Sequence, residues 1–246
     1  MTEIRSEATL YSYEGLEMSG FAAWDADKIG PRPLVLVVHE WWGCTEYAQR
    51  RATMLAELGY TGLAVDLYGA GRTAANPEEA GKLMNALLAD TRVLRGRFDS
   101  ALRKGLSLES VDPARAAAIG YCMGGGVVLH MARYGCDLAA VASFHGALPL
   151  AIAPEGEGGE VTARMAVYHG EADEFVTAED VSGFLAEVEK ARADCLFTLM
   201  PGCTHGFTNP EASVRGEKYG LPLRYDARAD RASWDHMQLV LDAAFS

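Results

Sequence analysis

The sequence lacks long apolar runs and has little positive charge. None of its apolar runs approaches the ~18 residues that a membrane-spanning helix needs. The first residues lack the basic and then apolar pattern of a secretory signal, so we expect neither leader nor anchor. A net charge of −12 would be repelled by nucleic acid and by anionic membranes. We therefore expect a small-molecule partner, with no nucleic acid and no membrane.

Cysteine is also scarce, and its spacing is not that of a metal site. The five cysteines stand at positions 44, 122, 136, 195 and 203 of a 246-residue chain, without the paired spacing of metal ligands. We expect no metal and no cofactor. An odd number of thiols in a chain long enough to bury a large core suits a reducing compartment, so the sequence indicates the cytoplasm.

Apolar runs and helical patterns alternate along the chain. Runs typical of parallel strands fill residues 33–39, 61–66, 116–119, 139–144, 165–169 and 196–200. Helical spacing is found at residues 46–58, 127–132, 178–191 and 228–245, and at 78–104 as one bent helix or two. Residues 10–13 and 18–24 are predicted as an antiparallel pair, and 153–160 as a surface loop. The pattern predicts an α/β fold with a doubly wound, mostly parallel sheet flanked by helices, in a single domain over residues 1–246.

The most informative segment is Gly-Tyr-Cys-Met-Gly-Gly at residues 120–125. It lies between a predicted strand and a predicted helix, and Gly-x-nucleophile-x-Gly in that position is a nucleophile elbow. Cys122 stands where serine is usual. Gly120 and Gly124 keep the turn free of side chains, and the backbone N–H of Met123 would face a developing oxyanion. The alternative is a buried cysteine in a glycine-rich turn.

Two further residues complete a possible triad in the chain order nucleophile, acid, histidine. Asp173 follows the strand predicted at 165–169, and His205 follows the strand predicted at 196–200. The ends of parallel strands meet at one edge of a sheet, so the three side chains should converge there. His205 would then take the thiol proton, and Asp173 would fix its tautomer. Taken singly, Asp173 could equally be a helix cap and His205 a loop histidine.

These motifs together resemble those of the dienelactone hydrolase family. The resemblance includes the segment at 120–125, His-Glu-Trp-Trp-Gly at 39–43 and Asp-Leu-Tyr-Gly at 66–69. It continues with His-Gly-Glu-Ala-Asp at 169–173 and Thr-His-Gly-Phe at 204–207. The blocks run in family order over nearly the full chain. The resemblance implies the α/β-hydrolase fold and a hydrolase that acts on esters or lactones.

The resemblance also implies roles for residues outside the triad. Glu40 matches a glutamate that contacts the resting thiol and takes part in its activation. A carboxylate there would disfavour the thiolate until substrate displaces it. The backbone N–H of Trp41 would be the second oxyanion donor, beside that of Met123. The wide, apolar pocket is expected to be lined by Trp42, Tyr68, Phe144, His145 and Phe207, although each of these could equally belong to the core.

The family's substrate-binding arginines are missing. Family members that take a carboxylate-bearing lactone hold it with two arginines, and the matching positions here are Pro77 and Asn209. An anionic ligand would lack its bidentate partners, although Arg72 or Arg92 could substitute. We therefore expect a neutral or activated carboxylic ester or lactone, cleaved through a thioacyl-enzyme by a monomer or weak homodimer. Phosphotriesters, dienelactone itself, and a non-enzymatic small-molecule binder are the alternatives.

Overall fold

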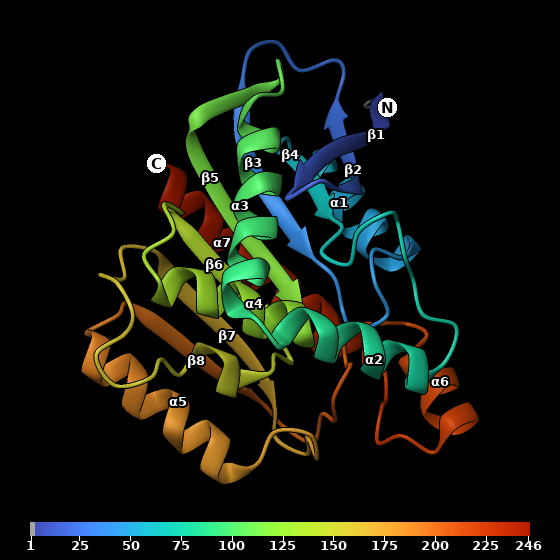
Figure 1. The fold of residues 1–246 in the computed structure, drawn as a ribbon, viewed down its shortest axis with the longest axis vertical. Helices are drawn as coiled ribbons and strands as arrows, with labels where there is room; N and C mark the ends of the chain where they lie inside the picture. The colour runs from blue at the N-terminus through green and yellow to red at the C-terminus, as the bar shows by residue number, and fades with distance from the viewer. Residues whose placement is uncertain (1–2) are drawn as a thin grey trace. The chain divides into compact units, whose positions relative to one another are not determined.

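The computed structural model describes residues 3–246. They form two compact units, the first ending at Ala118 and the second running from Ile119 to Ser246. Each unit contains strands of the sheet and helices that cover it (Figure 1). That the whole chain is one domain stays a prediction.

The first unit is built on five strands in the order β1-β2-β4-β3-β5. The bounds are Ile4–Tyr13 for β1, Leu16–Asp25 for β2, Arg32–Val38 for β3, Thr61–Val65 for β4 and Val111–Tyr121 for β5, which ends in the second unit. β1 pairs with β2 and β2 with β4 in antiparallel register, whereas β3 and β4 are parallel. Every residue of β3 and β4 is buried, as their apolar composition requires.

Three helices belong to this unit: α1 (Glu46–Glu57), α2 (Pro77–Leu88) and α3 (Thr91–Leu106). α1 packs on β2, β3 and β4, while α3 packs on β1, β3 and β4. The long helical pattern at 78–104 resolves into two helices, because Asp90 caps a new one. Its Oδ1 accepts a hydrogen bond from the N–H of Arg92 at 2.9 Å.

The strands of the second unit follow the order β5-β6-β7-β8. β6 is Ala140–Phe144, β7 is Arg164–Gly170 and β8 is Cys195–Met200, and these three are mutually parallel. The helices are α4 (Met123–Arg133), α5 (Ala178–Ala191), α6 (Ala212–Tyr219) and α7 (Ala227–Phe245), with the 3-10 turn η1 at Leu148–Ala151. α4 packs on β6, and α7 packs on β6 and β7; Figure 1 shows them on opposite faces of these strands. The predicted α/β fold with mostly parallel strands is confirmed.

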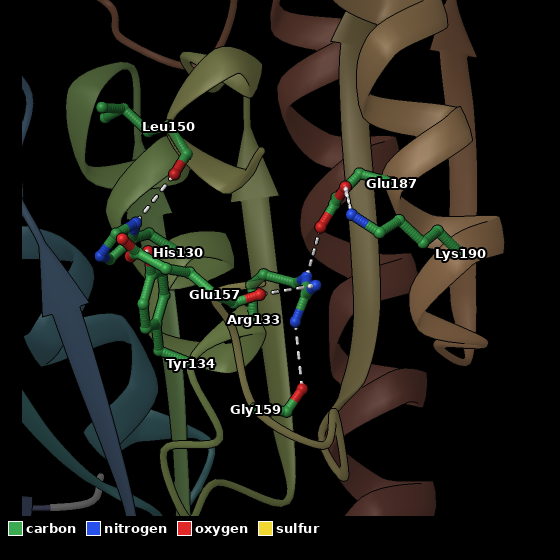
Figure 2. A network of polar contacts seen from close by, with 8 residues as sticks. All are labelled: His130, Arg133, Tyr134, Leu150, Glu157, Gly159, Glu187 and Lys190. Carbon is green, nitrogen blue, oxygen red and sulfur yellow. Dashed lines mark hydrogen bonds and ion pairs between the residues drawn. The ribbon is translucent and has the colours of Figure 1, made fainter. Parts of the chain in front are cut away.

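A buried ion pair joins two helices of the second unit (Figure 2). Arg133 at the end of α4 donates from Nε to Oε1 of Glu187 in α5 at 2.6 Å, and both side chains are less than a tenth exposed. Arg133 also donates from Nη1 to the carbonyl of Gly159 at 3.1 Å. The exposed loop at 153–160 is therefore fastened to α4, although its composition predicts little order.

Among residues 3–246, no helix is both long and apolar enough to span a membrane.

Candidate active site

Cys122 occupies a strained turn between β5 and α4. Its φ of 54° and ψ of −118° are rare for a residue with a side chain. The turn is tight, because a Cβ added at Gly120 would lie 2.0 Å from the carbonyl oxygen of Gly124. The glycine at that position is therefore obligatory. This geometry is that of a nucleophile elbow.

Backbone hydrogen bonds hold the elbow in this conformation. The N–H of Cys122 donates to the carbonyl of Phe144 at 3.1 Å, and its own carbonyl accepts from the N–H of Ala147 at 3.0 Å. Cys122 directly precedes α4, so Met123 is the first helical residue. Its N–H belongs to the positive end of the helix dipole, a place that favours a developing negative charge.

Asp173 and His205 form a buried pair in the same unit. Nδ1 of His205 lies 2.7 Å from Oδ2 of Asp173, whose side chain has no exposed surface. The other carboxylate oxygen accepts from the N–H of Phe175 at 2.9 Å, so the carboxylate is oriented by its own loop. The ring of Phe175 packs edge-on against the imidazole at 5.0 Å. Asp173 follows β7 and His205 follows β8, as the sequence predicts.

The imidazole of His205 is hydrogen-bonded to Cys122 as well as to Asp173. Burial by itself lowers the pKa of His205. The negative charge of Cys122 and the hydrogen bonds to Asp173 and Cys122 outweigh burial, and the pKa is raised well above 6.5. The structure thus brings thiol, imidazole and carboxylate into one chain of hydrogen bonds. Such a chain can carry a proton between sulfur and an incoming or departing group.

Three other cysteines have environments that suppress the thiolate. Burial, with a smaller contribution from the charge of Asp66, raises the pKa of Cys44 to about 12. Burial likewise raises the pKa of Cys195 to about 11, and it raises that of Cys203. These thiols stay protonated and unreactive at neutral pH. Cys122, in contrast, is hydrogen-bonded to the imidazole of His205.

Glu40 and Trp41 lie in the first unit, in the turn that follows β3. The turn is closed by a hydrogen bond from the N–H of Gly43 to the carbonyl of Glu40 at 3.2 Å. The buried ring of His39 lies 2.5 Å from the same carbonyl, and the hydroxyl of Tyr68 donates to the carbonyl of Trp41 at 2.9 Å. The backbone of this turn is therefore well fixed. The roles expected for Glu40 at the thiol and for Trp41 as an oxyanion donor stay predictions.

The residues predicted to line the pocket are almost entirely buried. Exposure is 4% for Trp42, 1% for Tyr68 and Phe144, and 0% for His145 and Phe207. Their pocket role stays a prediction. His145 has partners at both ring nitrogens: the N–H of Cys122 at 3.2 Å and the hydroxyl of Thr208 at 2.7 Å.

The residues considered for anion binding, or for the missing arginines, make contacts within the fold. Asn209 is 3% exposed, and its Oδ1 accepts from the N–H of Glu211 at 3.0 Å, just before α6. Pro77 begins α2, where a missing N–H costs nothing. Arg72 donates from Nε to the carbonyl of Gly69 at 3.1 Å and from Nη2 to that of Tyr68, while Arg92 pairs with Asp90 at 2.9 Å.

Sequence reasoning misses Thr208 and the part played by Asp66. Thr208 is 0% exposed and carries no motif signal. The carboxylate of Asp66 accepts backbone N–H groups from Tyr68, Gly69 and Gly71 at 2.8–2.9 Å, and so shapes the loop after β4. A loop that starts Asp-x-x-Gly is the available signal for such a turn.

In residues 3–246, no cluster of three or more His, Cys, Asp or Glu side chains is arranged to hold a metal ion.

Known proteins resemble this chain over nearly its whole length. The sequence profile of the dienelactone hydrolase family matches residues 18–245. A crystal structure of a dienelactone hydrolase-like promiscuous phosphotriesterase from metagenomic libraries is 30% identical, covers 98% of both chains and superposes with a TM-score of 0.91. A structure named m3DLH is 32% identical over 99% of both chains, with a TM-score of 0.92. A protein of Aquifex aeolicus, provisionally named a carboxymethylenebutenolidase, is 31% identical over 72% of this chain and 77% of its own.

Proposed function

The chain belongs to the dienelactone hydrolase family of ester- and lactone-cleaving hydrolases, and we propose that it works through Cys122, His205 and Asp173 by way of a thioacyl-enzyme. The observation that carries the proposal is the chain of hydrogen bonds from Cys122 through His205 to Asp173. Such a unit activates a nucleophile and later returns its proton to the leaving group.

Acylation begins with the thiolate of Cys122 beside a protonated His205. The sulfur attacks the carbonyl carbon of the ester, and the carbonyl π electrons move to oxygen to give a tetrahedral oxyanion. The N–H of Met123 stabilises that oxyanion, with the N–H of Trp41 as the second donor. As the carbon–oxygen bond to the leaving group breaks, His205 donates its Nε2 proton to the departing alkoxide. The thioester to Cys122 remains.

Deacylation reverses these roles with water as the nucleophile. Neutral His205 takes a proton from water, and the hydroxide attacks the thioester carbon. The second tetrahedral intermediate collapses with loss of the Cys122 thiolate, and the carboxylic acid departs. Asp173 keeps Nδ1 protonated throughout, so that Nε2 always faces the reacting atoms.

Glu40 is proposed to keep the resting thiol of Cys122 from ionising before substrate binds. A carboxylate near sulfur disfavours the anion, and substrate binding would displace it. The Glu40 carboxylate thus acts against His205, which stabilises the thiolate of Cys122. Removing the charge of Glu40 should therefore make the resting thiol more reactive. Glu40→Gln should therefore increase the rate of Cys122 alkylation by iodoacetamide while lowering turnover. Slower alkylation, or turnover as in the wild type, would remove Glu40 from the mechanism.

The proposed substrate is a neutral or activated ester or lactone. Pro77 and Asn209 supply no charge, and the Arg72 guanidinium is hydrogen-bonded to backbone carbonyls. A substrate carboxylate would therefore lack the bidentate partners that hold it in the family's lactone hydrolases. Trp42, Tyr68, Phe144, His145 and Phe207 are proposed to shape the apolar surroundings of the acyl group.

Phosphotriesters are a second candidate substrate class, favoured by one observation. The family structure with 30% identity and a TM-score of 0.91 is described as a promiscuous phosphotriesterase. A thiolate and an oxyanion hole that serve carbon could serve phosphorus as well. Dienelactone hydrolysis and non-enzymatic binding complete the alternatives.

A substrate panel separates these possibilities. The wild type and Cys122→Ala would be assayed on p-nitrophenyl acyl esters, neutral lactones, dienelactone and phosphotriesters. The proposal predicts the highest kcat/KM for neutral acyl esters or lactones, all of it lost in Cys122→Ala. A preference for phosphotriesters selects the second candidate. No turnover of any class, with ligand binding retained, selects the binder.

A catalytic thiol indicates the cellular compartment in which the enzyme would work. None of the five cysteines forms a disulfide within residues 3–246, and a nucleophilic thiol must stay reduced to act. We place the enzyme in the cytoplasm, as a monomer or weak homodimer with no cofactor. Oxidant sensitivity of the purified enzyme, reversed by a thiol reductant, would support that setting.

A further inference from the structure

His145 lies directly after β6 in an unusual backbone conformation. Its φ of 41° is in the left-handed region, which costs free energy for a residue with a side chain. Its N–H donates to the carbonyl of Tyr168 at 2.8 Å, which holds this backbone in place. The side chain is fully buried. The fold thus maintains a strained position that directs an imidazole inwards.

The hydrogen bonds of the ring fix its protonation. The N–H of Cys122 is shared between the carbonyl of Phe144 at 3.1 Å and Nδ1 of His145 at 3.2 Å, so Nδ1 acts as an acceptor and carries a lone pair. The remaining proton of a neutral imidazole then sits on Nε2, which lies 2.7 Å from Oγ1 of Thr208. Nε2 is therefore the donor and the threonine oxygen the acceptor. Protonation of Nδ1 would break the bond to the nucleophile's own amide.

The same ring touches the base of the triad. It packs edge-on against His205 with ring centroids 5.1 Å apart, and against Phe207 at 5.2 Å. Thr208 lies on the loop that carries His205. The His145 side chain is thereby hydrogen-bonded to the elbow at Cys122 and to the loop of His205, and it packs against the His205 ring.

Electrostatics gives a reason for a neutral ring at this place. His205 has a raised pKa and must carry a proton during acylation. A second imidazolium 5.1 Å away would repel that charge and lower the pKa of His205. The ionisable groups placed against His145 include Cys122 and His205, which belong to the proposed triad. The ring of Tyr121 is a further one, with its centroid 6.0 Å from that of His145.

We propose that His145 is a positioning residue, held as the neutral Nε2–H tautomer between the Cys122 amide and the Thr208 hydroxyl, and that it sets the register of nucleophile and base. The effect on turnover rests on the proposed function, whereas the tautomer does not. The role differs from the pocket role expected from the sequence, because the ring presents no free nitrogen to a substrate.

Nitrogen-15 NMR of the wild-type imidazoles tests the tautomer without any variant. The His145 signals should show a protonated Nε2 and an unprotonated Nδ1 from about pH 6 to pH 9, whatever the protonation state of His205. An Nδ1–H tautomer, or an imidazolium within that range, would overturn the proposal. This result stands even if the enzyme turns over no ester, so it separates the two proposals.

Turnover of the threonine variants tests the positioning role. Thr208→Val keeps the shape but removes the acceptor, and kcat should fall about tenfold to hundredfold with little change in KM, because the reacting groups lose register. Thr208→Ser restores the hydroxyl and should recover most of that loss. The pH profile of kcat should move with Thr208→Val and return with Thr208→Ser.

A matched control comes from the first unit. Thr9 is 2% exposed, and its hydroxyl has no hydrogen-bond partner among residues 3–246. Thr9→Val should therefore leave both kcat and the pH profile as in the wild type. Equal losses in Thr208→Val and Thr208→Ser, or wild-type kcat in Thr208→Val, would overturn the positioning role.

Discussion

The Nδ1 atom of His205 lies 2.7 Å from Oδ2 of Asp173, and the carboxylate is shielded completely from solvent. A buried carboxylate at this distance fixes both the orientation and the tautomer of the imidazole. Asp173 and His205 therefore form one hydrogen-bonded pair, and substitutions of either should have similar consequences.

Asp173→Asn should keep the geometry but favour the wrong tautomer of His205. We expect kcat to fall by about three to four orders of magnitude, with the fold intact. Glu171→Gln and Glu174→Gln are the controls from the same loop. Glu171 accepts the N–H of Gly202 at 2.8 Å in an exposed position, so its role is structural. Equal damage from either control would identify a different acid.

The raised pKa of His205 makes a signed prediction about pH. In the folded chain this proton is held more tightly than in the unfolded chain, where the pKa is 6.5. The resulting stabilisation is fully present below about pH 6.5 and is lost as the pH rises through the folded-state pKa. Asp173→Asn and Cys122→Ala should each lower the pKa of His205 in an NMR titration.

Urea unfolding of the wild type and Asp173→Asn would follow the same linkage. The difference in their free energies of unfolding should be largest near pH 6 and shrink at alkaline pH. A difference that grows with pH would show that the folded state does not hold the His205 proton.

The Arg133–Glu187 pair predicts a large stability effect away from the reacting groups. Arg133→Met removes the close partner of the buried Glu187 and leaves it the longer contact with Lys190 at 3.8 Å, so the variant should cost up to about 3–5 kcal/mol. Replacing both, as Arg133→Met with Glu187→Leu, should cost much less. The exposed pair of Lys82 and Glu78 at 2.6 Å is the control, since Lys82→Met should leave the free energy of unfolding almost unchanged. Similar costs for Arg133→Met and Lys82→Met in chemical denaturation would contradict this account.

Substrate charge should matter, because the expected arginines are missing. Among esters with one leaving group, those with a free carboxylate on the acyl part should have a higher KM than neutral ones. Asn209→Arg is a poor rescue, because Asn209 is buried and bonded to Glu211. Pro77→Arg is the better rescue and should reduce the difference in KM between anionic and neutral esters. Ala114→Arg adds the same charge at an exposed position of β5 and should not reduce it. A wild-type preference for anionic acyl groups would disprove the neutral-substrate assignment.

The sequence predicts the strand ends better than the contacts around them. The elbow, Asp173 and His205 are recognisable because glycine spacing and position after a strand are local signals. α6 is missed because it has only eight residues and no side-chain cap. The early part of β1 is missed because most of its residues are exposed.

Tertiary contacts explain why the sequence suggests a pocket role for His145, whereas the structure suggests a positioning role. An aromatic residue after a strand is equally compatible with pocket and core. Its partners, the Cys122 amide and Thr208, are distant in sequence, and the elbow motif around Cys122 predicts a pairing with His205, not with His145. Only the packed structure brings them to the two nitrogens of one ring.

The central claim is that Cys122 forms a covalent thioester. The most direct measurement is mass spectrometry of enzyme quenched during turnover of a p-nitrophenyl acyl ester, followed by peptide mapping. The account predicts one acyl group on Cys122 with a matching burst of p-nitrophenol. Cys122→Ala should show neither, with turnover lower by about 10⁴-fold or more. An acyl group on any other residue, or turnover in Cys122→Ala above about a tenth of wild type, would contradict it.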